Sequence, residues 1–203
     1  MSRLTIVVAS AVAVILAACA DSRSAPTTPT ASPSLSQSAA GSGKTDDVDR
    51  GRVVRMLDQC DPTTFDAALR DPHACVGNGH VTFDHFIAQL QRNQRADAWR
   101  FDPMRIELER GASLTAVNAG GEVHTFTRVA KFGGGIVPLL NTLSGTPDVA
   151  PECTTLGPDD FVAPGAMYTA ELSDGEHQLF QCCIHPWMRA ELKLKHGHHA
   201  EGD

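Results

Sequence analysis

The C-terminal half of the chain alternates between apolar and polar residues, as strands with one buried face do. The alternation begins near residue 103, where Met104, Ile106 and Leu108 are separated by polar residues. Further short runs of this kind are bounded by glycine-rich or polar turns, whereas residues 131–160 are loop-like. These runs cover residues 114–118, 123–129, 168–172, 180–182 and 190–194. Many short strands with regular turns predict a mostly-β protein with a β-sandwich.

A helical pattern precedes these strands. Asp61 followed by Pro62 is typical of a helix start, with a capping side chain and then proline at the first helical position. Thr82 offers a second start, and apolar residues follow it at helical spacing. These apolar residues are Phe83, Phe86, Ile87 and Leu90. We therefore expect residues 52–100 to form an N-terminal helical extension and residues 101–196 to form the β domain.

The N-terminus has the pattern of an export signal. Arg3 is followed by a nearly all-apolar run from Thr5 to Ala18. A membrane span needs roughly 20 apolar residues, so this run instead has the length of a signal-peptide core. It ends in Leu16-Ala17-Ala18-Cys19, which resembles a bacterial lipobox. We expect residues 1–18 to be removed and Cys19 to carry the lipid; the alternative is an ordinary secretory signal with a chance cysteine.

Two further segments have the composition of unstructured chain. Residues 19–51 are rich in Ser, Thr, Pro, Ala and Gly and cannot bury enough apolar surface to offset their ordering entropy. We interpret them as a tether between the lipid and the domain. Residues 197–203 form a histidine-containing tail. We expect this tail to be exposed, as chain ends usually are; the alternative is that its histidines bind metal weakly. The expected location is the cell envelope, membrane-anchored and facing the periplasm or the exterior.

Composition narrows the class of partner. The chain has 203 residues, of which 42% are hydrophobic, as in ordinary globular domains. Its formal net charge is -7, which argues against non-specific binding of nucleic acid. Such a charge suits a basic protein partner through electrostatic steering, although it also simply aids solubility.

The stretch that carries chemistry runs from Phe180 to Arg189. Within it Cys182, His185 and Met188 are spaced three residues apart, so one tight loop holds a thiolate, an imidazole and a thioether. Soft sulfur with imidazole suits copper, and two histidines, one cysteine and a weak axial methionine form the blue-copper arrangement. His124 is the best candidate for the second histidine.

Each of these assignments has an alternative. In the alternative for Cys182, this residue forms half of a disulfide and His185 lies at the surface. In the alternative for Met188, this residue packs in the core and copper has another axial ligand. His177 is the alternative to His124, although its strand neighbours indicate a side chain that faces solvent.

These residues resemble the cupredoxins, especially the plastocyanin and amicyanin-like group. The family pattern is a Pro-Gly, a strand, a glycine turn, an aromatic two residues before Cys, then Cys-x-x-His and a nearby Met. This chain matches it over about residues 103–195, at Pro164-Gly165, 168–172, Gly175, Phe180, Cys182, His185 and Met188. The resemblance implies a Greek-key β-sandwich with one mononuclear type 1 copper site. The chain departs from the family in an insertion around 131–160, in Val123 where Pro is frequent, in Cys183, and in the helical segment.

The remaining cysteines are expected to form disulfides. With Cys19 lipidated and Cys182 on copper, four cysteines are left, and they allow three connectivities. We favour Cys60–Cys75, because these two flank one short helical segment, and by elimination Cys153–Cys183. An exported protein lies in an oxidising compartment, which favours disulfides over the alternative, a zinc site of Cys60 and Cys75 with His73 and His80.

The expected function is one-electron transfer by copper in the cell envelope, with a redox protein partner such as a basic cytochrome. No catalytic triad, acid/base pair or phosphate loop stands out, so we do not expect an enzyme. The alternatives are a copper storage or chaperone protein, a structural domain without copper, and, less favoured, a small enzyme with an open copper position.

Overall fold

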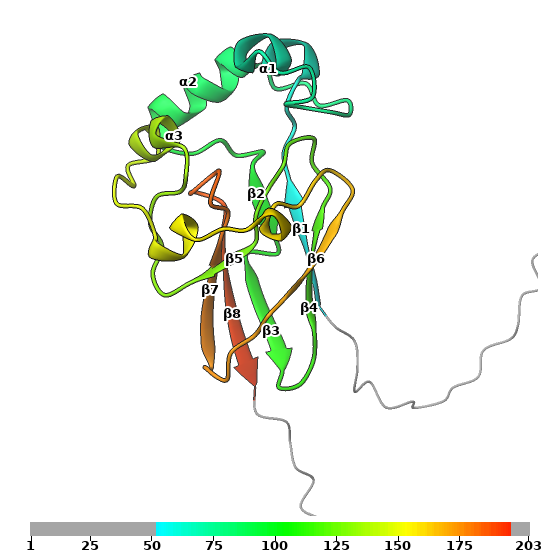
Figure 1. The fold of residues 1–203 in the computed structure, drawn as a ribbon, viewed down its shortest axis with the longest axis vertical. Coiled ribbons are helices and arrows are strands. Elements are labelled where there is room, and N and C mark those ends of the chain that lie inside the picture. Colours follow the sequence, from blue (N-terminus) through cyan, green and yellow to red (C-terminus); the bar gives the residue numbers. More distant parts are fainter. Residues whose placement is uncertain (1–51, 196–203) are drawn as a thin grey trace, which may run out of the picture. The chain divides into compact units, whose positions relative to one another are not determined.

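Two four-stranded sheets enclose the apolar core of this protein (Figure 1). The computed structural model describes residues 52–195. The predicted signal peptide, the tether, Cys19 and the histidine-containing tail lie outside the described residues. None of the helices within 52–195 combines the length and apolar character that crossing a membrane requires.

The first sheet has the strand order β2-β1-β4-β6. Its strands are β1 (Arg52–Leu57), β2 (Arg100–Asp102), β4 (Leu114–Asn118) and β6 (Met167–Ala170). β1 runs parallel to β4, whereas the β1–β2 and β4–β6 pairs are antiparallel. Because side chains alternate along a strand, Val54 and Met56 of β1 both enter the core.

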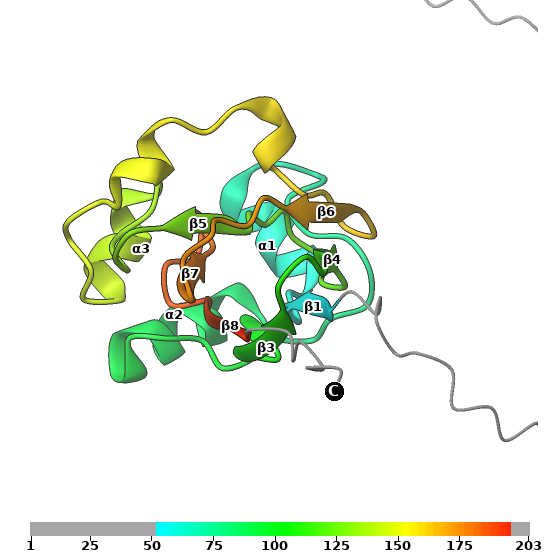
Figure 2. The ribbon, with the colours of Figure 1, turned by 90° about the horizontal axis from the view of Figure 1, so that it is seen from below.

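The second sheet has the strand order β3-β8-β7-β5. Its strands are β3 (Arg105–Glu109), β5 (Thr127–Val129), β7 (His177–Gln181) and β8 (Arg189–Lys195). β3 and β8 are parallel and the other two pairs antiparallel. Both sheets supply residues to the core. Figure 2 shows the strands from below, with β5, β7 and β8 to the left of β1, β4 and β6. The predicted mostly-β sandwich is confirmed.

The prediction of a helical extension over 52–100 is wrong at its start, because residues 52–57 form β1 of the first sheet. The run Arg52-Val53-Val54-Arg55-Met56 itself has period two in burial, with Val54 and Met56 fully buried. Its parallel partner is β4, far along the chain, so the neighbouring residues do not reveal the pairing. The sandwich therefore includes residues 52–57, ahead of the predicted boundary at 101.

The two predicted helices are present, inserted between strands of one sheet. They are α1 (Pro62–Leu69) and α2 (Phe83–Asn93), and they lie between β1 and β2 in the chain. The side chains of Asp61 and Thr82 accept the backbone N–H groups of Thr64 and His85, as expected of N-caps. We call residues 58–99 the first excursion.

A second long segment, residues 130–166, connects β5 to β6 and is called the second excursion. It contains α3 (Pro138–Leu143) and two short 3₁₀ turns, η1 (Pro151–Thr154) and η2 (Pro158–Asp160). Figure 1 shows α1, α2 and α3 at the end of the strands where the β7–β8 connection turns. Both excursions thus gather near the predicted ligand loop.

Candidate metal centre

The predicted ligand loop is the tight connection between β7 and β8. β7 ends at Gln181 and β8 begins at Arg189, which leaves seven residues for the turn. The Cys182 N–H donates to the Met188 carbonyl at 3.0 Å, and the Met188 N–H donates to the His185 carbonyl at 2.9 Å. These bonds fold the loop back on itself, so Cys182, His185 and Met188 are held together by their own backbone.

His124 reaches the centre from a different part of the chain, ahead of β5. It forms an isolated antiparallel bridge with Val162. The His124 N–H donates to the Val162 carbonyl at 3.2 Å, and the Val162 N–H donates to the His124 carbonyl at 2.8 Å. The predicted strand over 123–129 is therefore regular only at Thr127–Val129. Asn118 braces this segment, because its amide donates to the carbonyls of Glu122 and Val162, each at 2.8 Å.

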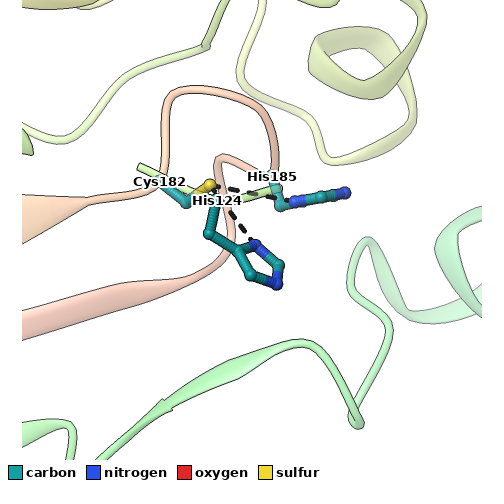
Figure 3. Close-up of side chains that lie close together, drawn as sticks. All are labelled: His124, Cys182 and His185. Atoms are coloured by element: carbon teal, nitrogen blue, oxygen red, sulfur yellow. Dashed lines mark hydrogen bonds between the residues drawn. The ribbon is translucent and has the colours of Figure 1, made fainter. Parts of the chain in front are cut away.

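Three of the four predicted ligands converge (Figure 3). The Cys182 Sγ lies 3.8 Å from the Nδ1 of His124 and 3.8 Å from the Nδ1 of His185. All three ligand atoms lie within 4.8 Å of one another. The exposed fractions are 0% for His124 and Cys182 and 2% for His185. The cluster is thus closed to solvent.

This spacing fits one metal ion bound by all three residues. Metal–sulfur bonds of about 2.3 Å and metal–nitrogen bonds of about 2.0 Å at roughly 120° place the two donor atoms about 3.7 Å apart. The observed separations of 3.8 Å agree with that value. The donor set of one thiolate and two imidazoles is of the soft kind that copper prefers.

The other two candidates have different positions. Met188 ends the loop and is fully buried, so it lies in the right segment; its role as axial ligand stays a prediction. His177 begins β7, at the opposite end of that strand from Cys182, and its side chain is exposed. His177 is not part of the cluster.

The cluster is strongly polarised in the metal-free protein. Burial acts to raise the pKa of Cys182, but its contacts with His124 and His185 outweigh burial and hold the pKa well below the usual range. Burial acts to lower the pKa of His124, but the hydrogen bonds to Asp58 and Cys182 raise it to about 9. The contacts within the cluster thus favour the thiolate form of Cys182 and the protonated form of His124.

Sequence reasoning missed the two acidic residues behind the histidines. Asp58 Oδ2 lies 2.8 Å from His124 Nε2, and Glu122 Oε2 lies 3.5 Å from His185 Nε2. Glu122 also accepts the indole N–H of Trp99 at 2.5 Å. Asp58 precedes His124 by 66 residues, so no spacing in the chain marks it as a partner.

The two predicted disulfides are confirmed: the structure contains Cys60–Cys75 and Cys153–Cys183. The alternative zinc site is thereby excluded in this structure, because the sulfurs of Cys60 and Cys75 are bonded to each other. Among residues 52–195, Cys182 is the free cysteine. The thiol with the perturbed pKa is thus also the one thiol in this part of the chain that remains available to a metal.

Comparison with known proteins gives a weak likeness to cupredoxins. No protein-family model matches the chain, and no curated protein matches it. Among solved structures, a purple cupredoxin from Nitrosopumilus maritimus is 15% identical, with a TM-score of 0.34 over 49% of this chain and 86% of that one. Oxidised plastocyanin from Dryopteris crassirhizoma is 15% identical, with a TM-score of 0.36 over 71% of this chain and 100% of the other.

A third solved structure is similar to the same degree. It is a mutant amicyanin in its reduced state, which is 16% identical, with a TM-score of 0.32 over 47% of this chain and 73% of that one. Likenesses at this level are too weak to carry a functional argument. The function has to be inferred from the chemistry of the cluster itself.

Proposed function

We propose that this protein is a copper-binding one-electron carrier of the cell envelope. The observation that carries the proposal is the buried cluster in which one cysteine sulfur lies 3.8 Å from a ring nitrogen of each of two histidines. In this proposal Cys182 is the strong thiolate ligand, His124 and His185 are the imidazole ligands, and Met188 is the weak axial ligand of one type 1 site. When bound, copper supplies a centre that exchanges one electron between two oxidation states.

The chain's own residues favour electron transfer over the alternatives. An electron can reach a closed centre, whereas a substrate or a copper acceptor must touch the ion directly. His124, Cys182 and His185 are at most 2% exposed, which supports a centre that keeps its ion and admits no substrate. The lowered pKa of Cys182 further supports metal binding, because the thiolate is the form that ligates. We therefore propose a carrier rather than an enzyme or a copper chaperone.

The test is the visible spectrum after Cu(II) is added to the metal-free protein. We expect strong colour from charge transfer between the Cys182 sulfur and copper, and its loss in Cys182→Ser. His124→Ala should change the spectrum by opening a coordination position, and His177→Ala is its matched control on an exposed strand. Met188→Gln should keep copper bound and shift its reduction potential.

The other outcomes separate the remaining functions. Bound copper without colour would favour storage or a chaperone, and failure to bind copper would favour a structural domain. Binding of azide or nitrite to the coloured protein would indicate an enzyme with an open position. An unchanged spectrum in His124→Ala would contradict the ligand assignment.

Location and partner form a separate part of the proposal. The motif Leu16-Ala17-Ala18-Cys19 supports a lipid anchor at Cys19, and two or more acyl chains would hold the protein stably at a membrane. Cys19→Ser should release the protein from membranes or block its processing; a mature variant that still sediments with membranes contradicts the anchor. The net charge of -7 supports a basic redox partner, with association that slows as salt is added.

A further inference from the structure

Asp58 is a buried carboxylate placed directly behind one histidine of the cluster. It immediately follows the last residue of β1 and is 3% exposed. Its Oδ2 lies 2.8 Å from the Nε2 of His124, and the two side chains are fully buried. His124 therefore has the cysteine sulfur on its Nδ1 side and a carboxylate on its Nε2 side.

The carboxylate is itself held by backbone donors. Oδ1 accepts the N–H of Gly121 at 2.8 Å and that of Cys60 at 3.3 Å, and Oδ2 accepts the N–H of Glu122 at 3.1 Å. A Cβ atom on Gly120 would overlap Oδ2, so only glycine leaves room for the carboxylate there. Backbone N–H groups of the first excursion and of the turn that precedes His124 thus hold the Asp58 carboxylate in position.

A histidine that binds a metal keeps hydrogen on only one ring nitrogen, and this arrangement decides which nitrogen of His124 that is. An ionised carboxylate only accepts hydrogen bonds, so the Nε2 facing it is the protonated nitrogen. The backbone N–H groups of Cys60, Gly121 and Glu122 all donate to this carboxylate, and hydrogen bonds of that kind favour its ionised form. Nδ1 is then the nitrogen left to face Cys182, as the structure has it.

We propose, on the basis of the copper function above, that Asp58 is the positioning residue of the centre. It sets the tautomer and ring orientation of His124, so that Nδ1 is the ligand atom. Its buried negative charge also favours the more positive oxidation state of the bound metal, and so lowers the reduction potential. Such partners of ligating histidines typically change metal affinity about 10–100-fold.

Glu122 has the same place behind His185 but a weaker contact. Its Oε2 lies 3.5 Å from His185 Nε2 and is already engaged by the indole of Trp99. The shorter contact of 2.8 Å makes Asp58 the stronger partner. Glu122→Gln should therefore change metal affinity in the same direction as a substitution at Asp58, but by less.

The first arm of the test compares Asp58→Asn with wild type and with Asp66→Asn. Asp66 also accepts a backbone N–H in the first excursion, that of Cys75 at 3.1 Å, and it is a control for a merely structural role because the structure shows no contact with either histidine. In Asp58→Asn the preference for Cu(II) over Cu(I) should fall about tenfold or more, which is a rise in potential of about 59 mV per tenfold. Asp66→Asn should leave the potential unchanged; equal shifts in both variants, or none, overturn the proposal.

The second arm uses Zn(II), which needs no redox activity. Asp58→Asn should bind Zn(II) about 10–100-fold more weakly than wild type, and unchanged zinc affinity overturns the positioning role. A wild type that never becomes coloured with copper but shows this zinc effect would overturn the proposed function and leave the positioning role standing. The two failures are therefore distinguishable.

A third measurement needs no variant and so does not depend on the folding of Asp58→Asn. Nitrogen NMR of the wild-type protein loaded with Cu(I) should show His124 protonated at Nε2, with slow exchange because the site is buried. A signal from a metal-bound Nε2 and a protonated Nδ1 would overturn the proposal whatever the variants do.

Discussion

The two excursions approach the same ligand cluster by different means. The first excursion contacts it through side chains: Asp58 bonds to His124, and the ring of Phe86 meets that of His185 edge-on, with centroids 6.4 Å apart. Its disulfide, Cys60–Cys75, closes the excursion on itself. Asp58 and Phe86 thus bring a charge and an aromatic ring from this region to the histidines, whereas Glu122, the carboxylate behind His185, lies outside both excursions.

The second excursion contacts the ligand loop through backbone hydrogen bonds and one disulfide. The Ile136 N–H donates to the Cys183 carbonyl at 2.7 Å, and a Cβ on Gly135 would overlap that carbonyl. The Gly133 N–H donates to the Gln181 side chain at 3.0 Å. Its disulfide, Cys153–Cys183, ties it to the residue next to Cys182. This region fixes where the loop lies and contributes no charge to the histidines.

The position of the ligand loop and the chemical environment of the histidines therefore depend on different regions of the chain. Substitutions in the first excursion should change the properties of the bound metal, whereas those in the second should change stability and loop geometry. Variants in each region test whether the two excursions have these separate roles.

The largest effect is expected for Trp99→Ala in the first excursion. Trp99 is 1% exposed, packs on Phe86 with centroids 4.6 Å apart, and donates to Glu122. The loss of this ring should lower the free energy of unfolding by about 3–5 kcal/mol, as measured by urea denaturation. Leu69→Ala is the matched control, because Leu69 lies in the same excursion but is 50% exposed, and its cost should stay within about 0.5 kcal/mol. Equal losses of stability in the two variants would contradict the buried packing of Trp99 on Phe86.

Removal of either disulfide should be the next largest effect. The double variants Cys60→Ala/Cys75→Ala and Cys153→Ala/Cys183→Ala should each lose about 2–5 kcal/mol of stability. Only the second pair is attached to the ligand loop, so its removal should shift the visible band of the copper protein more. A larger spectral shift on removal of Cys60–Cys75 would break the division between the two regions.

A smaller effect is expected at Asn141 in the second excursion. Asn141 is 4% exposed; it accepts the Gly135 N–H at 2.7 Å and donates to the Gly135 carbonyl at 2.9 Å. Asn141→Ala should cost about 1–3 kcal/mol, because it leaves two buried backbone groups unpaired. The reduction potential should stay unchanged, unlike in Asp58→Asn. The exposed neighbour Thr142→Ala is the control, with a cost within about 0.5 kcal/mol.

The smallest effect is a pH slope in the metal-free protein. The pKa of His124 rises from 6.5 to about 9 on folding, so its stabilising contribution is complete below 6.5 and is lost as the pH rises through 9. The lowered pKa of Cys182 acts oppositely and offsets this loss between those values. Cys182→Ser removes the offset together with the part of the His124 shift that Cys182 causes. The contact with Asp58 still raises the pKa of His124, so that variant should lose stability as the pH rises above 6.5, over a narrower range than the full shift would give.

The same slope distinguishes the two excursions. Adding Asp58→Asn to Cys182→Ser should reduce the slope, because the hydrogen bond to Asp58 is the largest single cause that raises the pKa of His124 and it is still present in Cys182→Ser. Adding Asn141→Ala should lower stability at every pH and leave the slope as it was. Urea denaturation of the metal-free variants from about pH 6 to about pH 9.5 measures both. A slope that Asn141→Ala abolishes would contradict the assignment.

The features that could be predicted from the sequence are those that depend on neighbouring residues. Period-two runs predicted most of the strands, and capping residues predicted α1 and α2. Cys182, His185 and Met188 were recognisable as ligand candidates because one short loop holds them all. The cysteine count left three connectivities, and the position of Cys60 and Cys75 on either side of one short helical segment favoured the pairing that the structure contains.

The features that depend on contacts between residues far apart in the chain became visible only in the folded structure. β1 became a strand through its pairing with β4, and Asp58 became the partner of His124 across 66 residues. Glu122 met Trp99 in the same way. A buried carboxylate has no signature in its neighbours, because what stabilises it is a set of donors that only the folded chain brings together. The spacing in the sequence thus marks Cys182, His185 and Met188 as candidates, whereas it gives no sign of the carboxylates behind His124 and His185.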